Sequence, residues 1–106
     1  MSTRSSPSGA SRLRVRWTRL ALADFASAQR YIAAENPQAA TDIARRIRVS
    51  VLKLVQFPYI GRPGDDLKSR EWRVQRTPYL LVYRLSGDVI EIIRVWHEKR
   101  DPQLMR

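Results

Sequence analysis

The sequence predicts an α+β domain in the order β-α-α-β-β-β, with a helical hairpin packed on one face of a small, mainly antiparallel sheet. Three observations predict this fold class. Two stretches in the first half repeat apolar residues at the helical period, a proline ends the second stretch, and residues 70–102 read as three short strands. Helices followed by strands, without alternation, are typical of a helical layer on one sheet. A chain of 106 residues accommodates one domain, which we expect over residues 14–106.

The first half predicts one strand and two helices. Arg14–Trp17 alternates and contains a β-branched and an aromatic residue, which indicates a short strand. Thr18 is suited to cap the first helix, and Asn36 with Pro37 is suited to begin the second. Pro58 stops the second helix. The expected core faces are Ala21, Phe25, Ala28 and Ile32 in the first helix, and Ala40, Ile43, Ala44, Ile47, Val51, Leu54 and Val55 in the second.

The second half predicts three strands. A turn-rich loop without periodicity covers residues 58–66, and the strands are expected at residues 72–76, 79–85 and Val89–His97. Ser86, Gly87 and Asp88 form the hairpin turn between the last two strands. The last strand is apolar on both faces, which indicates a central position in the sheet. The expected core face of the strand before it is Tyr79, Leu81, Tyr83 and Leu85.

The chain is strongly basic. It has 20 Lys and Arg against 10 Asp and Glu, a net charge of +10, and seventeen of the 20 are arginine. Such a charge attracts nucleic acid, an anionic membrane or an acidic protein segment. The excess of arginine fits bidentate contact with carboxylate or phosphate, although the codon bias of a GC-rich genome would also produce it. The charge therefore predicts an anionic partner without identifying it.

Some kinds of site are disfavoured by what the chain lacks. It has no cysteine and a single histidine, so we expect no disulfide, no metal site and no cofactor. No apolar run approaches the ~18 residues of a membrane span, so we expect no membrane partner. Residues 1–13 are rich in serine and arginine and lack a long apolar segment, which predicts a flexible basic tail rather than a secretory signal.

Five motifs, in order within residues 13–102, resemble the RelE/ParE superfamily of bacterial toxins. They are Asn36-Pro37-x-Ala39-Ala40, Pro58-Tyr59-Ile60-Gly61-Arg62-Pro63, Arg70-Glu71, Tyr79-x-x-Val82-Tyr83-Arg84 and Ile93-x-Val95-x-His97. The resemblance implies a toxin of the bacterial cytoplasm, encoded with an antitoxin that wraps and silences it. A basic surface fits an acidic, partly disordered antitoxin segment that folds on binding. The expected contact is the charged face of the second helix, at Arg45, Arg46 and Lys53.

RelE-like members of the superfamily are ribosome-dependent mRNA endonucleases, and this chain lacks most of their pattern. That pattern has two lysines at alternate positions of one strand, an arginine after the first tyrosine of the next strand, and a later arginine and tyrosine. The corresponding residues here are Arg73, Gln75 and Leu80, followed by Lys99 and Arg100 without a tyrosine. Some ribonuclease relatives use a histidine near the end of the last strand. A catalytic site would therefore comprise His97, Arg73 and Arg100.

ParE-like members resemble the chain more closely, through Gly61-Arg62-Pro63, Arg70-Glu71 and the Val-x-His ending. This resemblance implies a poison of DNA gyrase that binds and traps the enzyme without catalysis of its own. The expected target-binding cations lie on the strands and on the end of the chain, which we expect to be flexible. They are Arg73, Arg84, Arg94, Lys99 and Arg100.

Two plainer interpretations stay open. The first is a basic nucleic-acid-binding module, although no helix-turn-helix, RNP-type or OB-type signature accompanies the charge. The second is that the single histidine, His97, hydrogen-bonds the end of the sheet, and that the arginines form local ion pairs on a solvated surface.

Overall fold

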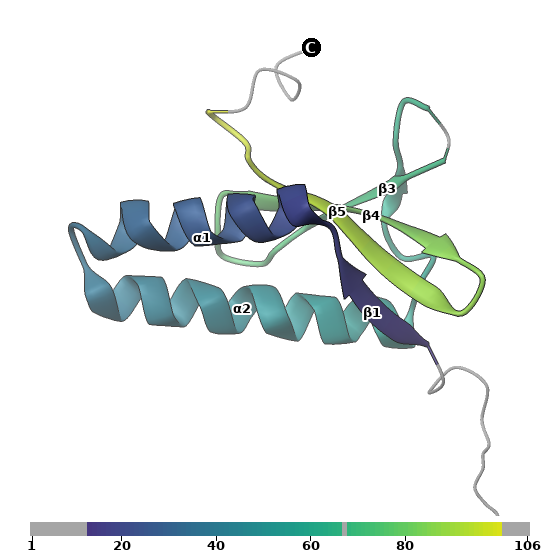
Figure 1. Ribbon diagram of the computed structural model, residues 1–106, viewed down its shortest axis with the longest axis horizontal. Helices are drawn as coiled ribbons and strands as arrows, with labels where there is room; N and C mark the ends of the chain where they lie inside the picture. The colour runs from purple at the N-terminus through teal and green to yellow at the C-terminus, as the bar shows by residue number, and fades with distance from the viewer. Residues whose placement is uncertain (1–12, 67, 101–106) are drawn as a thin grey trace, which may run out of the picture.

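The computed structural model describes residues 13–66 and 68–100, which form five strands and two helices. In chain order they are β1 (Arg14–Trp17), α1 (Arg19–Ala33), α2 (Pro37–Gln56), β2 (Arg62–Pro63), β3 (Arg70–Arg73), β4 (Tyr79–Ser86) and β5 (Val89–His97). Figure 1 shows α1 and α2 side by side, joined by a tight turn. The predicted α+β class is confirmed. Of the predicted tail, residues 1–12 lie outside the described residues, and Leu13 packs against the core.

Both helices begin where the local sequence predicts. The Thr18 hydroxyl accepts a hydrogen bond from the Ala21 N–H at 3.0 Å, and the Asn36 side chain accepts one from the Ala39 N–H at 3.1 Å. Pro37 occupies the first turn of α2. These bonds satisfy N–H groups that have no acceptor within the helix. Neither of these two described helices combines the length and the apolar character needed to cross a membrane.

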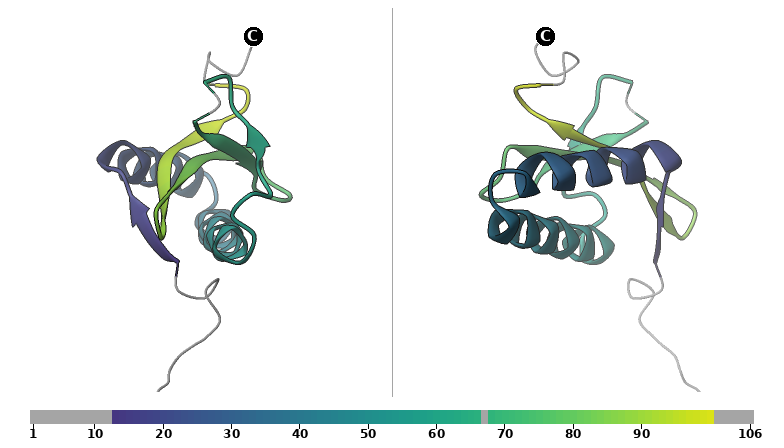
Figure 2. Two further views of the ribbon diagram at one scale, coloured as in Figure 1. Left: turned by 90° about the vertical axis from the view of Figure 1, so that its right-hand side faces the viewer. Right: turned by 60° about the vertical axis from the view of Figure 1, so that its left-hand side comes forward.

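The sheet is mixed, with strand order β1-β5-β4-β3-β2. β1 runs parallel to β5, and the other neighbouring strands are antiparallel. β5 therefore lies inside the sheet, as its apolar sequence on both faces predicts. Figure 2 shows the strong twist of the sheet beside the helical hairpin.

One apolar core joins the helices to the sheet, and the predicted core faces supply part of it, together with Val74 and residues of β5. Ile47 and Leu54 of α2 and Tyr83 of β4 are fully buried. Val82, on the other face of β4, is also buried, so that face is not wholly solvated. The buried cluster consists of Ala21, Ala28, Ile47, Val51, Leu54, Val74, Tyr79, Leu81, Tyr83, Ile90, Ile92 and Val95.

The loop expected at residues 58–66 contains a short strand that the sequence did not predict. Arg62 and Pro63 of β2 pair with Glu71 and Arg70 of β3. A two-residue edge strand that includes a proline has no periodicity, so only its pairing partner reveals it.

The strand expected at residues 72–76 begins and ends earlier, at Arg70–Arg73. After Arg73 the Val74 N–H still donates to the Tyr79 carbonyl, at 2.9 Å, and this bond closes the connection between β3 and β4. Arg76 then takes a left-handed conformation, with φ of 63°. The boundary is set by the tight connection to β4 rather than by the propensity of these residues.

Candidate functional site

The strand arginines Arg73 and Arg84 form ion pairs within the chain. Arg73 pairs with Glu98, and the Nε of Arg84 donates to Glu91 at 2.9 Å. Their side chains are still 59% and 47% exposed. Both guanidinium groups are therefore oriented by a neighbouring carboxylate while remaining accessible to a partner.

Arg94 is not the exposed cation that the sequence indicated. Its guanidinium donates two hydrogen bonds to Asp24 of α1, at 2.8 and 3.0 Å, and only 28% of its side chain is exposed. Asp24 also accepts the N–H of Val95 at 2.9 Å. The pairing of β1 with β5 ends at Trp17 and Ile92, so β1 does not reach Val95. The Asp24 carboxylate takes the place of a strand carbonyl as the acceptor for the Val95 N–H. Arg94 therefore fixes α1 to the sheet.

Glu91 lies between two arginines of the sheet. It accepts hydrogen bonds from Arg16 at 2.8 Å and from Arg84 at 2.9 Å, and the residue is 8% exposed. Burial by itself would raise the pKa of Glu91, but the two guanidinium groups outweigh burial and hold the pKa below the ordinary value of 4.5. An ionised Glu91 thus holds Arg84 in a fixed position.

The depressed pKa of Glu91 predicts a pH-dependent contribution to stability. This contribution is complete above the ordinary pKa of 4.5 and is lost as pH falls through the lower folded-state pKa. We expect Glu91→Gln to destabilise the chain by up to about 1 kcal/mol at pH 7, because both arginines are largely exposed, and by much less at pH 3. Urea unfolding across this range measures the difference. The stabilising role of the ionised Glu91 would be contradicted if the loss of unfolding free energy in Glu91→Gln did not change with pH. It would also be contradicted if the control Glu35→Gln showed the same pH trend.

A pocket of about 350 Å³ lies where β5 ends beside α1. The His97 ring packs edge-on against Tyr79 with 5.2 Å between centroids, and His97 Nδ1 accepts the Lys99 N–H at 3.1 Å. The Arg100 guanidinium donates to the Tyr79 hydroxyl at 3.4 Å and lies 4.3 Å from the centre of the Tyr31 ring. Through these contacts Arg100 lies against α1 and β4. The pocket is lined by Asp24, Ser27, Ala28, Tyr79, Val95, His97 and Arg100.

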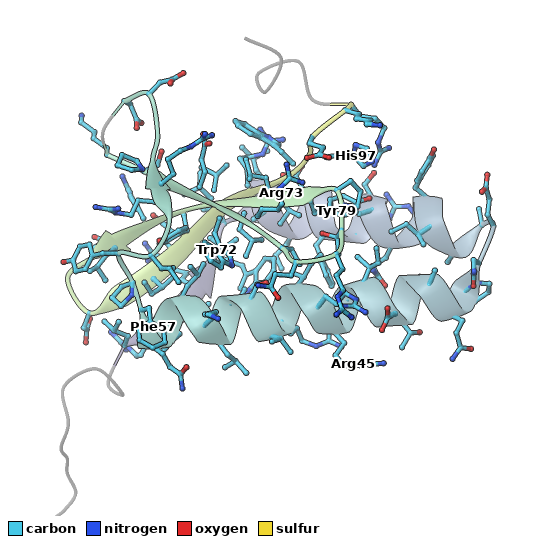
Figure 3. The ribbon with its side chains drawn as sticks, turned by 180° about the vertical axis from the view of Figure 1, so that it is seen from behind. Arg45, Phe57, Trp72, Arg73, Tyr79 and His97 are labelled. Carbon is cyan, nitrogen blue, oxygen red and sulfur yellow. The ribbon has the colours of Figure 1, made fainter. Side chains whose placement is uncertain are left out.

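The residues proposed for a ribonuclease are only partly brought together. His97 and Arg100 share this pocket, whereas Arg73 does not line it and pairs with Glu98 instead. Figure 3 shows Tyr79 close to His97, with Arg73 farther along the sheet. Gln75 and Leu80, at positions where the RelE pattern has cations, line two other pockets. Among the described residues, no group of three or more His, Cys, Asp or Glu side chains is placed to hold a metal ion.

The three predicted cations of α2 meet β3 in a pocket of about 280 Å³. Arg45 and Arg46 both pair with Asp42, at 3.5 and 3.1 Å, and such exposed pairs within one helix contribute little to stability. Trp72 of β3 adds an aromatic surface beside these charges, and Figure 3 shows it between α2 and the sheet. The pocket suits a carboxylate next to an apolar group. Its lining residues are Arg45, Arg46, Val49, Ser50, Lys53, Trp72 and Gln75.

A larger pocket of about 430 Å³ between β1, α1 and α2 is almost wholly apolar. Leu22 and Leu52, which help to line it, are 54% and 64% exposed. The charged residue at its margin is Arg48. Large exposed aliphatic side chains beside a cavity are typical of a surface that another protein covers.

The chain after α2 also exposes large apolar side chains, two of which lie in the turn-rich loop predicted at residues 58–66. Phe57, Tyr59 and Ile60 are 55%, 67% and 38% exposed. Three such residues within four positions of a turn are the signal that could have identified this surface, because turns are ordinarily polar.

Comparisons with known proteins agree with the fold. The family described as the ParE toxin of type II toxin–antitoxin system, parDE, matches residues 15–102. The Y4kP protein of Sinorhizobium fredii (strain NBRC 101917 / NGR234) is 38% identical over 96 residues, which cover 90% of this chain and 99% of the relative. Toxin RelE2 of Caulobacter vibrioides is 32% identical over 84 residues, covering 79% and 93%. The solved structure of the chromosomal ParDE TA system from P. aeruginosa contains a chain with a TM-score of 0.72 and 27% identity, covering 82% and 97%.

The chain therefore belongs to the ParE toxin family of type II toxin–antitoxin systems, within the RelE/ParE superfamily. The names of the relatives include both RelE and ParE.

Proposed function

We propose that this chain arrests bacterial growth in the cytoplasm by binding and trapping DNA gyrase, without catalysis of its own. The observation that carries the proposal is the missing catalytic set. Gln75 and Leu80 replace cations of the RelE pattern, and Arg73 does not line the pocket that holds His97. Cleavage of RNA requires a proton acceptor, a proton donor and cations around a single phosphate. The missing cations at positions 75 and 80, and the ion pair that engages Arg73 with Glu98, support a poison that acts by binding.

A cognate antitoxin with an acidic, partly disordered segment neutralises the toxin in this proposal. Its carboxylates bind Arg45, Arg46 and Lys53, and its apolar side chains fill the apolar pocket at Leu22 and Leu52. A basic pocket and an apolar pocket that are both lined by α2 support such a partner, because an amphipathic segment that folds on binding can contact both. The P. aeruginosa structure is of a ParDE system, which supports a comparable pairing for this chain.

The proposed gyrase-binding cations are Arg73, Arg84, Lys99 and Arg100. Lys99 is exposed, and the ion pairs of Arg73 and Arg84 leave about half of each side chain accessible. Arg94 is removed from this set because its guanidinium is committed to Asp24.

Pulse labelling after induction of the chain without its antitoxin tests the proposal. Gyrase poisoning predicts that DNA synthesis stops within the first minutes while protein synthesis continues. An immediate stop in protein synthesis, with DNA synthesis continuing, would contradict it and indicate a ribosomal target.

An mRNA endonuclease is the second candidate, and the pocket shared by His97, Tyr79 and Arg100 favours it. His97→Asn separates the two functions, because an asparagine oxygen can still accept the Lys99 N–H but cannot transfer protons. We expect growth arrest to change by less than about twofold, since a binding poison needs no proton transfer. A general acid or base contributes about 10²–10⁴-fold to rate, so a loss of this size would support the endonuclease instead. Thermal unfolding of the variant serves as the control for folding.

A further inference from the structure

The loop that joins α2 to β2 holds its apolar side chains outward on a closely bonded backbone. Tyr83, fully buried in β4, donates from its hydroxyl to the Pro58 carbonyl at 2.8 Å and accepts the Gly61 N–H at 2.9 Å. Arg70 donates to the carbonyls of Tyr59 at 3.2 Å and of Gly61 at 2.8 Å. The Arg70 guanidinium also lies 5.2 Å from the centre of the Tyr59 ring. The loop is therefore fixed before any partner binds.

Tyr59 and Ile60 lie outside the buried core cluster, although their backbone is held by the sheet. Tyr59 and Ile60 are 67% and 38% exposed, whereas the backbone on either side of them is hydrogen-bonded to the sheet. A fixed loop loses little conformational entropy on binding, so its exposed aromatic and aliphatic side chains can contribute more of their burial energy to an interface. Aromatic residues near arginine are also the commonest energetic centres of protein interfaces.

The loop lies between two of the exposed strand arginines. Tyr59 and Arg84 line one pocket of about 360 Å³, together with Lys68. Ile60 and Arg73 line another of about 300 Å³. Each pocket thus combines an apolar loop residue with an accessible guanidinium, and the second also contains Arg62, which pairs with Glu71 at 2.8 Å. The surface suits apolar side chains placed among carboxylates on the partner.

We propose that Tyr59 and Ile60, flanked by Arg84 and Arg73, form the surface that binds the target of the toxin, and that the target presents an acidic patch of a folded protein. A folded partner fits because the loop is already ordered and both surfaces meet without rearrangement. The antitoxin occupies the α2 side of the molecule instead. This inference rests on the proposed function, in which the toxin acts by binding.

The test uses the double variant Tyr59→Ser/Ile60→Ser in the full chain. Tyr59 is 67% exposed but Ile60 only 38%, so thermal unfolding of the variant is measured first to show that it stays folded under the conditions of the growth assay. Growth arrest is measured against the amount of toxin produced, and affinity is measured for the co-purified cognate antitoxin. We expect at least tenfold more variant toxin to be needed for the same arrest, with the Kd for antitoxin within about threefold of wild type. Leu20→Ser, which removes a 59% exposed leucine from α1, is the matched control and should leave arrest unchanged.

The outcomes separate this inference from the proposed function. A double variant as toxic as the wild type would overturn the inference. Loss of antitoxin binding together with toxicity would also overturn it and assign the loop to the antitoxin. The growth assay reports toxicity whichever target the toxin binds. If arrest requires Tyr59 and Ile60 but no gyrase is trapped, the inference is supported and the gyrase proposal is contradicted. A wild-type chain that arrests no growth would contradict both.

Discussion

Gly61→Ala is expected to lower the free energy of unfolding by about 3 kcal/mol, which is a large fraction of the stability of a small domain. A Cβ atom at Gly61 would lie 2.6 Å from the Tyr83 hydroxyl oxygen, 2.7 Å from its ring and 2.9 Å from the Glu71 carbonyl oxygen. None of these groups can move easily, because Tyr83 is fully buried and the Glu71 carbonyl belongs to β3. Movement of the loop instead would break the hydrogen bonds that Gly61 makes with Tyr83 and Arg70.

Urea unfolding measures this effect, which should appear as a lower midpoint at an unchanged slope. The matched control is Gly64→Ala in the same loop. The nearest atom there is the Ser69 side-chain oxygen at 2.9 Å, and its carbonyl is 3.3 Å away, so a smaller loss of about 1 kcal/mol is expected. Equal losses for the two variants would contradict the packing described between the loop and Tyr83.

Asp24→Ala is expected to lower the free energy of unfolding by about 2 kcal/mol. The substitution leaves the Arg94 guanidinium without its bidentate partner and removes the acceptor of the Val95 N–H. Removing one member of a buried pair costs more than the pair contributes, because the other charge stays desolvated. The expected loss is below the usual cost for fully buried pairs, since 28% of the Arg94 side chain and 18% of the Asp24 side chain are exposed.

Two variants test this explanation. Asp24→Asn keeps an oxygen for the Val95 N–H while removing the charge, so an intermediate loss is expected. Asp42→Ala removes an exposed carboxylate that pairs with Arg45 and Arg46, and should cost less than about 0.5 kcal/mol. Thermal unfolding of the three proteins gives the comparison. If Asp24→Ala costs no more than Asp42→Ala, Asp24 does not join α1 to the sheet as described.

The local signals in the sequence were sufficient for most of the fold. The caps at Thr18 and Asn36 depend on residues three positions away, and the hairpin at Gly87 depends on its own turn. Such features depend on residues close together in the sequence, so they can be predicted without knowing the tertiary contacts. The central position of β5 followed from its apolar sequence on both faces. The short strand β2 could not be found in this way, because it exists only through its pairing with β3.

The state of the arginines could not be predicted, because it depends on distant partners. Arg94 pairs with Asp24 at a separation of 70 residues, and the sequence alone gives no reason to associate them. Arg73 and Arg84 remain accessible, but Glu98 and Glu91 orient them. Likewise, Tyr83 was predicted as a core residue, while its hydrogen bonds to the loop depend on the folded geometry. The sequence therefore indicated the cations of the candidate surface, but not Tyr59 and Ile60, nor the ion pair that removes Arg94 from it.

The most direct test of gyrase poisoning combines the purified toxin with purified DNA gyrase, plasmid DNA and ATP. Denaturation of the mixture then reveals any DNA that is covalently held and cut by the enzyme. The proposed mechanism predicts that linear, protein-linked plasmid accumulates with toxin concentration and is suppressed by the cognate antitoxin. The claim that the toxin poisons gyrase would be contradicted by a toxin that arrests growth and cleaves mRNA on ribosomes, but whose purified preparation causes no increase in cut plasmid.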